Sequence, residues 1–252
     1  MPTVEDLFVQ LADGDQAVSF HANHVLLEKA TRATKSGMEA DRKSLASDLA
    51  RELTATLPAE KDRQGKELPA RLKHSAAVRN RILYLMSYLS TSEEVPALAE
   101  ALKDLQTREA ARYALERNDS KEATQTLIDA LEQLGPEFRV GVVNSLSKRR
   151  SDEVLAALQR ATSDRDAEVR VAAAEALANF PDAENDVFII KAANSGSAAE
   201  KNRAYRSRLR LAETLRLAGN KAAAGQIYRA VSASDAETPQ KKAAQIGLKA
   251  LA

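Results

Sequence analysis

Apolar positions in the middle of the chain recur in one register, which repeats four times around Arg79, Arg108, Arg139 and Arg170. The steps between these arginines are 29, 31 and 31 residues. The residues one before, three after and seven after each arginine are apolar, except that Thr107 stands before Arg108. A period of about thirty is typical of stacked helix pairs, because each pair has an apolar face that only its neighbours can bury. The pattern therefore predicts an all-α fold, an α-α superhelix.

The flanking segments also show helical spacing. Four leucines recur every fourth position at the end of a predicted helix over residues 38–57: Leu45, Leu49, Leu53 and Leu57. The polar stretch 58–69 predicts a loop, and the next helix is expected over 71–89. Towards the other end, residues 194–197 read as a connection before a long helix over 199–218. The chain is thus predicted to consist of an N-terminal helical cap (1–66), a repeat array (67–197) and a C-terminal helical cap (198–252).

Helix starts within the array have their own signal. Ser92, Ser120 and Ser151 each precede an acidic residue and then an apolar run. A serine hydroxyl that accepts a backbone N–H, with carboxylates near the positive helix end, is the composition expected at an N-cap. We therefore expect these three serines to begin the second helix of successive pairs.

Composition limits the chemistry that the chain can perform. Aromatic residues make up 4% of the 252 residues, tryptophan and cysteine are absent, and there are 9 Gly and 7 Pro. A core of Ala and Leu suits closely packed helix pairs better than a β-sandwich or barrel. The absence of cysteine excludes thiol nucleophiles, thiolate metal sites and disulfides. No nucleophile elbow or phosphate-binding loop occurs, so we expect no enzyme and no cofactor.

Three stretches of the array resemble the HEAT-repeat family, and in particular short bacterial arrays similar to phycobilisome lyases. They are residues 110–117 (AARYALER), 139–146 (RVGVVNSL) and 169–177 (VRVAAAEAL). The resemblance covers roughly residues 70–252 and implies a HEAT-type α-solenoid, which serves mostly as an interaction module. Residues 211–220 (LAETLRLAGN) resemble a tetratricopeptide helix pair, with Gly219 at a left-handed helix end.

Some HEAT-like proteins have further activities. Di-iron hydroxylases of this type use repeated His-Glu pairs, and the chain contains no His-Glu dipeptide. Damage-reading DNA glycosylases use aromatic side chains, which are scarce here. Bilin lyases act with a partner subunit, and no bilin pocket is recognisable in the sequence. A bilin-lyase-like subunit or a metal-dependent enzyme is the third alternative. His21 and His24 could face one side of a helix and bind a metal, but no second cluster of ligands appears.

Charge is balanced overall but unevenly distributed. The net formal charge is +1, yet residues 1–28 carry −5 and residues 201–252 carry +8. The densest basic run places Arg203, Arg206 and Arg210 on one helix face. This face could remain solvated or bind an acidic partner or a nucleic-acid backbone. The opposite charges of the two ends also predict weak head-to-tail self-association.

The leading functional prediction is a non-catalytic scaffold that binds a peptide or protein on its concave face, lined mainly by the second helix of each pair. Tyr84 and Tyr88, beside Arg81, are candidate partner-binding residues because interfaces favour Tyr and Arg. The alternative is nucleic-acid or phosphate binding through the face from Arg203 to Arg210. No apolar run long enough to span a membrane occurs. The sequence at face value predicts a cytoplasmic protein, or a periplasmic or secreted one if a signal peptide has been removed.

Overall fold

The computed structural model describes residues 2–64, 66–194 and 196–251, where the regular elements are helices apart from two isolated β-bridges. The expected all-α fold, with helices packed in consecutive pairs, is confirmed. Contacts divide the chain into two compact units, Met1–Leu127 and Ile128–Ala252. Ser195, in the expected connection, lies outside the described residues. The division into cap, array and tetratricopeptide-like cap stays a prediction.

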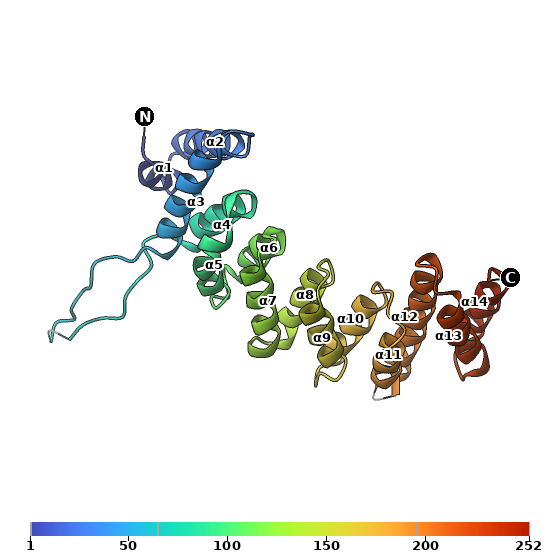
Figure 1. The fold of residues 1–252 in the computed structure, drawn as a ribbon. Coiled ribbons are helices and arrows are strands. Elements are labelled where there is room, and N and C mark those ends of the chain that lie inside the picture. The colour runs from blue at the N-terminus through green and yellow to red at the C-terminus, as the bar shows by residue number, and fades with distance from the viewer. Residues whose placement is uncertain (1, 65, 195, 252) are drawn as a thin grey trace. The chain divides into compact units, whose positions relative to one another are not determined.

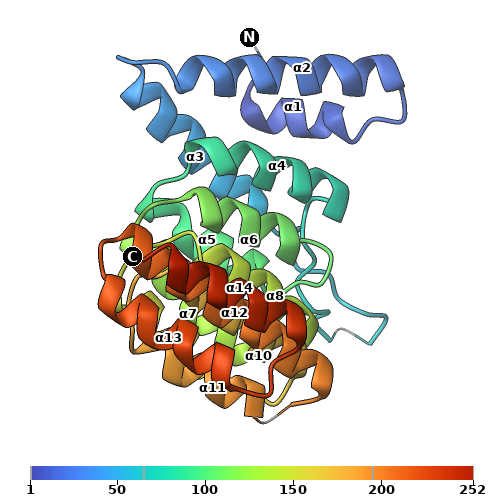
Figure 2. The same cartoon turned by 90° about the vertical axis from the view of Figure 1, so that its right-hand side faces the viewer.

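The N-terminal unit stacks its helices in two layers. In one layer α4 packs against α6, and in the other α3 packs against α5 (Figure 1). Figure 2 shows α1 and α2 lying side by side beyond α3 and α4. The helices are α1 (Val4–Leu11), α2 (Gln16–Ala33), α3 (Glu39–Thr54), α4 (Ala76–Leu89), the 3-10 turn η1 (Ser92–Glu94), α5 (Val95–Ala101), α6 (Arg108–Arg117) and α7 (Lys121–Gln133), within which the unit ends.

Within the C-terminal unit the helices also pack in consecutive pairs. Helix α10 packs against α8 and α12, and α13 packs against both α12 and α14. The helices are α8 (Pro136–Leu146), α9 (Asp152–Ala161), α10 (Ala167–Leu177), α11 (Asn185–Asn194), α12 (Ala198–Leu217), α13 (Lys221–Ala233) and α14 (Thr238–Lys249). We call α4, α6, α8, α10 and α12 the first helices, and α5, α7, α9, α11 and α13 the second helices of successive pairs.

The repeated register of the sequence forms the core of the first helices. Every residue one before, three after and seven after the four arginines is at most 4% exposed. Thr107, the exception to the apolar pattern, is fully buried because its hydroxyl donates to the carbonyl of Ala101 at 2.9 Å. A buried hydroxyl that is hydrogen-bonded costs little, so threonine can occupy this apolar column.

Two predictions about the region before α4 are wrong in detail. Helix α3 ends at Thr54 instead of continuing to Leu57, and α4 begins at Ala76 instead of residue 71. Between them the chain forms an arm, because residues 55–57 and 71–73 pair through their backbones and a second bridge joins Lys61 and Glu67. Leu57, the last member of the leucine stripe, is 36% exposed. Pairing with residues 71–73 therefore replaces the last helical turn.

The base of the arm is fastened by a buried charged group. Glu52 is 3% exposed and lies 2.8 Å from His74 Nε2 and 3.2 Å from Lys73 Nζ. Burial alone would raise the pKa of Glu52, but the hydrogen bonds with His74 and Lys73 lower it below its ordinary value. The ring of Phe8 packs edge-on against His74. The arm is thereby tied to α3 and α1.

The predicted N-caps at Ser120 and Ser151 are present, whereas that at Ser92 is wrong. Ser120 Oγ accepts the N–H of Ala123 at 3.1 Å, and Ser151 Oγ accepts that of Val154 at 3.3 Å. At η1 the cap is Thr91, whose backbone N–H donates to the Glu94 carboxylate at 2.8 Å. The reciprocal capping box needs an acid three residues on, which Thr91 has and Ser92 lacks.

The last three helices depend on two glycines. Gly219 adopts φ +88° between α12 and α13, which confirms the left-handed helix end expected there. A Cβ on Gly247 would lie 2.4 Å from the ring of Tyr228, so only glycine lets α14 approach α13 this closely. Tyr228 donates to Glu213 at 3.0 Å, and burial together with this bond raises its pKa to about 12.

Candidate binding surfaces

Arg79 and Arg139 of the register form ion pairs that join a first helix to the turn after its second helix. Arg79 donates to Asp104 at 2.6 Å and Arg139 donates to Asp164 at 3.0 Å, in each case 25 residues further on. The N–H of Gln106 and the guanidinium of Arg79 lower the pKa of Asp104. These side chains are mostly buried, so each pair fixes the turn after a second helix against the first helix that precedes it.

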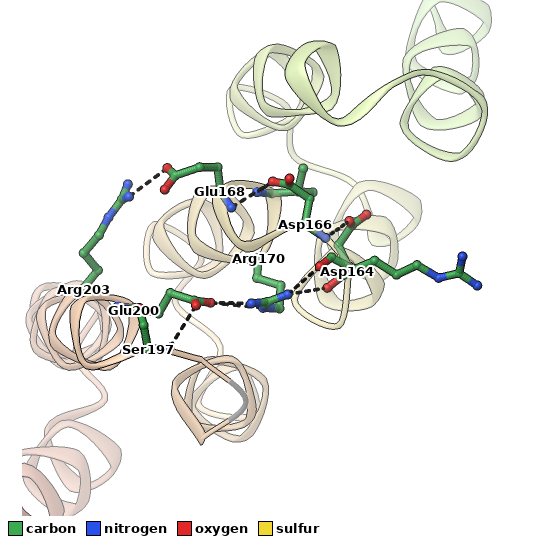
Figure 3. Close-up of polar contacts among 9 residues, drawn as sticks. Asp164, Asp166, Glu168, Arg170, Ser197, Glu200 and Arg203 are labelled. Carbon is green, nitrogen blue, oxygen red and sulfur yellow. Dashed lines mark hydrogen bonds and ion pairs between the residues drawn. The ribbon is translucent and has the colours of Figure 1, made fainter.

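Arg170 forms a different contact. Its Nε and Nη2 donate to Glu200 Oε2 at 3.2 and 2.7 Å, and its Nη1 donates to the carbonyl of Asp164 at 2.9 Å (Figure 3). Glu200 also accepts the N–H of Ser197. This bond, together with the bonds from Arg170, lowers the pKa of Glu200. Arg170 therefore joins the turn before α10 to the start of α12.

An open groove lies beside the Arg79–Asp104 pair. Leu53 and Leu72 form one wall and Ala97 and Ala101 of α5 form the other, with a volume of about 380 Å³. Glu100 stands at its rim with a side chain that is 63% exposed. We call this the Arg79 groove.

An equivalent groove occurs in the C-terminal unit beside the Arg139–Asp164 pair, with a volume of about 280 Å³. We call it the Arg139 groove. Five lining positions of the two grooves stand 60 residues apart in the sequence: Arg79 and Arg139, Ala97 and Ala157, Glu100 and Arg160, Ala101 and Ala161, and Asp104 and Asp164. The grooves are therefore a property of the repeat, and at one equivalent rim position Arg160 stands in place of Glu100.

The basic run of α12 is largely neutralised by neighbouring carboxylates. Arg203 contacts Glu168 at 3.0 Å and Glu175 at 3.1 Å. Lys201 pairs with Asp235, and the buried Arg208 donates two bonds to Asp186, at 2.7 and 2.9 Å.

Arg206 and Arg210 are exposed on the same helix. The predicted face thus retains two of its three guanidinium groups for a partner. A role in binding nucleic acid or phosphate stays a prediction.

Tyr84 and Tyr88 lie on α4 with 40% of their surface exposed, and the structure brings two further residues to them. Tyr113 of α6 is 39% exposed, and Arg117 of α6 lies over the Tyr88 ring at 4.7 Å and 5.8 Å from that of Tyr113. We call Arg81, Tyr84, Tyr88, Tyr113 and Arg117 the Tyr–Arg patch. Tyr113 and Arg117 of α6 were not predicted from the sequence. One repeat step carries Tyr84 to Tyr113, which is the signal that could have found it.

The histidines do not gather with other ligands. His21 and His24 are exposed on α2, and His24 lies 3.3 Å from Glu28. Across residues 2–64, 66–194 and 196–251, no three His, Asp or Glu side chains are placed to hold a metal ion. Over the same residues, no helix combines the length and apolar character needed to cross a membrane.

Residues 95–178, and again residues 124–207, match the family described as HEAT repeats. Residues 95–207 form a HEAT-repeat array. The two matches span the second helix α5 through the first half of α12, and they include the register arginines Arg108, Arg139 and Arg170. No curated protein matches the sequence.

Several solved structures are similar to this HEAT-repeat chain. The archaeal HEAT-like repeats protein from Thermococcus onnurineus NA1 is 12% identical to this chain, with a TM-score of 0.51. The superposition covers 100% of this chain and 97% of the archaeal chain. The complex of CpcE and CpcF of phycocyanin lyase from Nostoc sp. PCC7120 is 18% identical, with coverage of 100% and 96% and a TM-score of 0.41. At such identities the similarity shows the fold alone.

Proposed function

We propose that this chain is a non-catalytic scaffold, which binds a peptide or an extended segment of a partner protein on the second helices. The observation that carries the proposal is the equivalence of the Arg79 and Arg139 grooves, which are lined by matching residues in two units of the chain. A repeat protein that presents the same open groove more than once has a surface suited to a ligand with repeated side chains.

The walls of each groove are held before any ligand arrives. Alanines on the second helix leave the space, and the Arg79–Asp104 or Arg139–Asp164 ion pair fixes the turn at the groove end. Binding then requires little ordering of the protein, so more of the contact free energy appears as affinity. Ala97 and Ala101 offer apolar contact without a reactive group, which supports a binding role over a catalytic one.

The rims provide selectivity. Glu100 pairs with Lys103 at 2.6 Å and Arg160 pairs with Glu132 at 3.5 Å, and all four side chains are exposed. A basic ligand residue would replace Lys103 at Glu100, and an acidic one would replace Glu132 at Arg160. Each groove then favours a ligand residue of one sign, because a residue of the other sign would lie beside a like charge. We therefore propose that each groove binds a segment that carries apolar side chains and a charge opposite to its rim residue.

Exchange of the two rim charges tests this proposal. A partner is first isolated from the source organism with the immobilised chain, and its affinity is then measured for the charge reversals Glu100→Arg and Arg160→Glu. Each reversal is expected to weaken binding by about tenfold, because an attraction becomes a repulsion.

Matched controls are Glu184→Arg and Lys242→Glu, which make the same change of charge at exposed positions away from the grooves. A partner that binds the rim variants and the controls with equal affinity would show that the grooves are not the binding site.

A further inference from the structure

The Tyr–Arg patch is a preformed surface on the first helices of the N-terminal unit, on the opposite layer from the Arg79 groove. The rings of Tyr84 and Tyr88 pack edge-on at 5.4 Å, and the two hydroxyl groups lie 3.2 Å apart. Arg81 lies over the Tyr84 ring at 4.8 Å. Arg117 is held by a bond from Nε to the carbonyl of Ser87 at 3.0 Å. Two arginines and three tyrosines are thus fixed relative to one another without a ligand.

The patch contains hydrogen-bond donors but no carboxylate. Neither Arg81 nor Arg117 forms an ion pair among the described residues. The pKa of Tyr88 is raised by its bond with Tyr84 and by burial, and the remaining groups that affect it are Tyr113 and Arg117. Because Tyr88 donates to Tyr84, the hydroxyl proton of Tyr84 is available to a ligand. The patch can therefore donate to an anion from several directions.

The surroundings of Arg81 give the strongest support for an anion-binding role of the patch. Its Nε and Nη2 are sealed from solvent and have no hydrogen-bond acceptor, and burial lowers its pKa. A desolvated guanidinium without a counter-ion destabilises the folded chain. Nη1 of Arg81 is not one of these buried atoms, so an anion at the surface of the patch can contact the guanidinium there.

We propose that the Tyr–Arg patch binds an acidic segment of a partner protein, with carboxylates placed on Arg81 and Arg117 and the intervening chain on the tyrosine rings. Tyr and Arg are the residue types that dominate binding energy at protein interfaces. Carboxylates accept hydrogen bonds and donate none, which matches a surface of donors. A nucleic-acid backbone would require neutralisation of many phosphates, and the patch offers two cations. This proposal is independent of the two grooves.

Intrinsic fluorescence reports on the patch directly. The chain has no tryptophan, and three of its five tyrosines lie in the patch. The probe is a peptide of alternating glutamate and proline, which is extended before binding and contains no aromatic residue. At low salt we expect a saturable change in tyrosine fluorescence on addition of this peptide. The same peptide with glutamine in place of glutamate should give no change.

The variants Arg81→Gln and Arg117→Gln retain all tyrosines, and together they should weaken peptide binding by at least about tenfold. The control is the double variant Arg206→Gln and Arg210→Gln, which removes the same charge from exposed positions of α12. Circular dichroism checks that each variant is folded.

Three results would overturn the proposal. They are the absence of any response to the glutamate peptide at low salt, equal weakening in the control, and tighter binding of single-stranded DNA than of the peptide to the same patch. The first would contradict acid recognition, the second would assign the effect to overall charge, and the third would make the patch a nucleic-acid site.

Discussion

Arg203 and Arg208 of the C-terminal unit have different surroundings from Arg81 and Arg117 of the N-terminal unit. In the C-terminal unit, Arg203 lies between two carboxylates of α10 and Arg208 binds Asp186 of α11. In the N-terminal unit, Arg81 and Arg117 face tyrosine rings and no carboxylate. The guanidinium groups of Arg203 and Arg208 stabilise contacts between helices, whereas those of the Tyr–Arg patch remain able to bind an external anion. A carboxylate on a neighbouring helix therefore separates these two structural arginines from the two arginines of the Tyr–Arg patch.

The largest effect is expected from Asp186→Ala. This change leaves the buried Arg208 without its carboxylate, so the free energy of unfolding of the C-terminal unit should fall by about 3 kcal/mol. Urea unfolding followed by circular dichroism measures the loss. Glu168→Ala removes an exposed partner of Arg203 and should cost less than about 1 kcal/mol. Equal costs for the two variants would break the distinction between buried and exposed pairs.

Paired substitutions of Arg79 and Arg81 compare the two kinds of arginine on one helix. Arg79→Met removes the ion pair with Asp104 and should cost about 2 kcal/mol of unfolding free energy. Arg81→Met removes a guanidinium without an acceptor and should change stability by less than about 0.5 kcal/mol, because the lost cation–π contact is offset by relief of desolvation. Thermal unfolding of both variants tests the difference. A larger loss for Arg81→Met would mean that Arg81 is structural.

Acid sensitivity should follow the carboxylates that bind arginines. Hydrogen bonds from Ser197 and Arg170 lower the pKa of Glu200, so its stabilising contribution is present above the ordinary glutamate pKa and is lost as pH falls through the lowered value. Glu200→Gln should therefore be less stable than the parent chain by about 1 kcal/mol at neutral pH. The two unfolding free energies should converge in acid. Curves that remain parallel as pH falls would contradict this role.

The smallest expected effect is self-association through the oppositely charged ends. Residues 1–28 carry −5 and residues 201–252 carry +8. In the last three helices, several of these cations are neutralised by internal pairs, so the attraction between copies should be weak. Sedimentation at high protein concentration should show association at low salt that disappears as salt screens the charges. A monomer under all these conditions would remove head-to-tail contact from consideration.

The sequence predicted the elements that depend on local pattern. The arginine register, the burial of its apolar columns and the turn at Gly219 were all readable, because helical spacing and a left-handed glycine leave direct signals. The arm was missed because pairing between residues 55–57 and 71–73 is set by contacts across a loop, and the local leucine spacing favoured a helix. Tertiary pairing overrode helix propensity there.

The candidate surfaces were only partly predictable. Tyr84, Tyr88 and Arg81 share a helix, so their spacing was visible in the sequence. Tyr113 and Arg117 join them only because α6 packs against α4. Arg203 was predicted to belong to a basic face, but Glu168 and Glu175, which are distant in sequence, lie beside it. Counter-ions from another helix cannot be read from one helix's own sequence.

The arm has a consequence for how the N-terminal unit could be divided. Its two sides are held together by backbone bonds between Leu57 and Arg71 and between Lys73 and Ala55, and its base is held by Glu52. Trypsin could cut at the exposed Lys61 between these fixed points. The resulting fragments should remain associated at neutral pH, because the helices on either side still share a core. The arm is thus a natural place to split the chain into two pieces that reassemble.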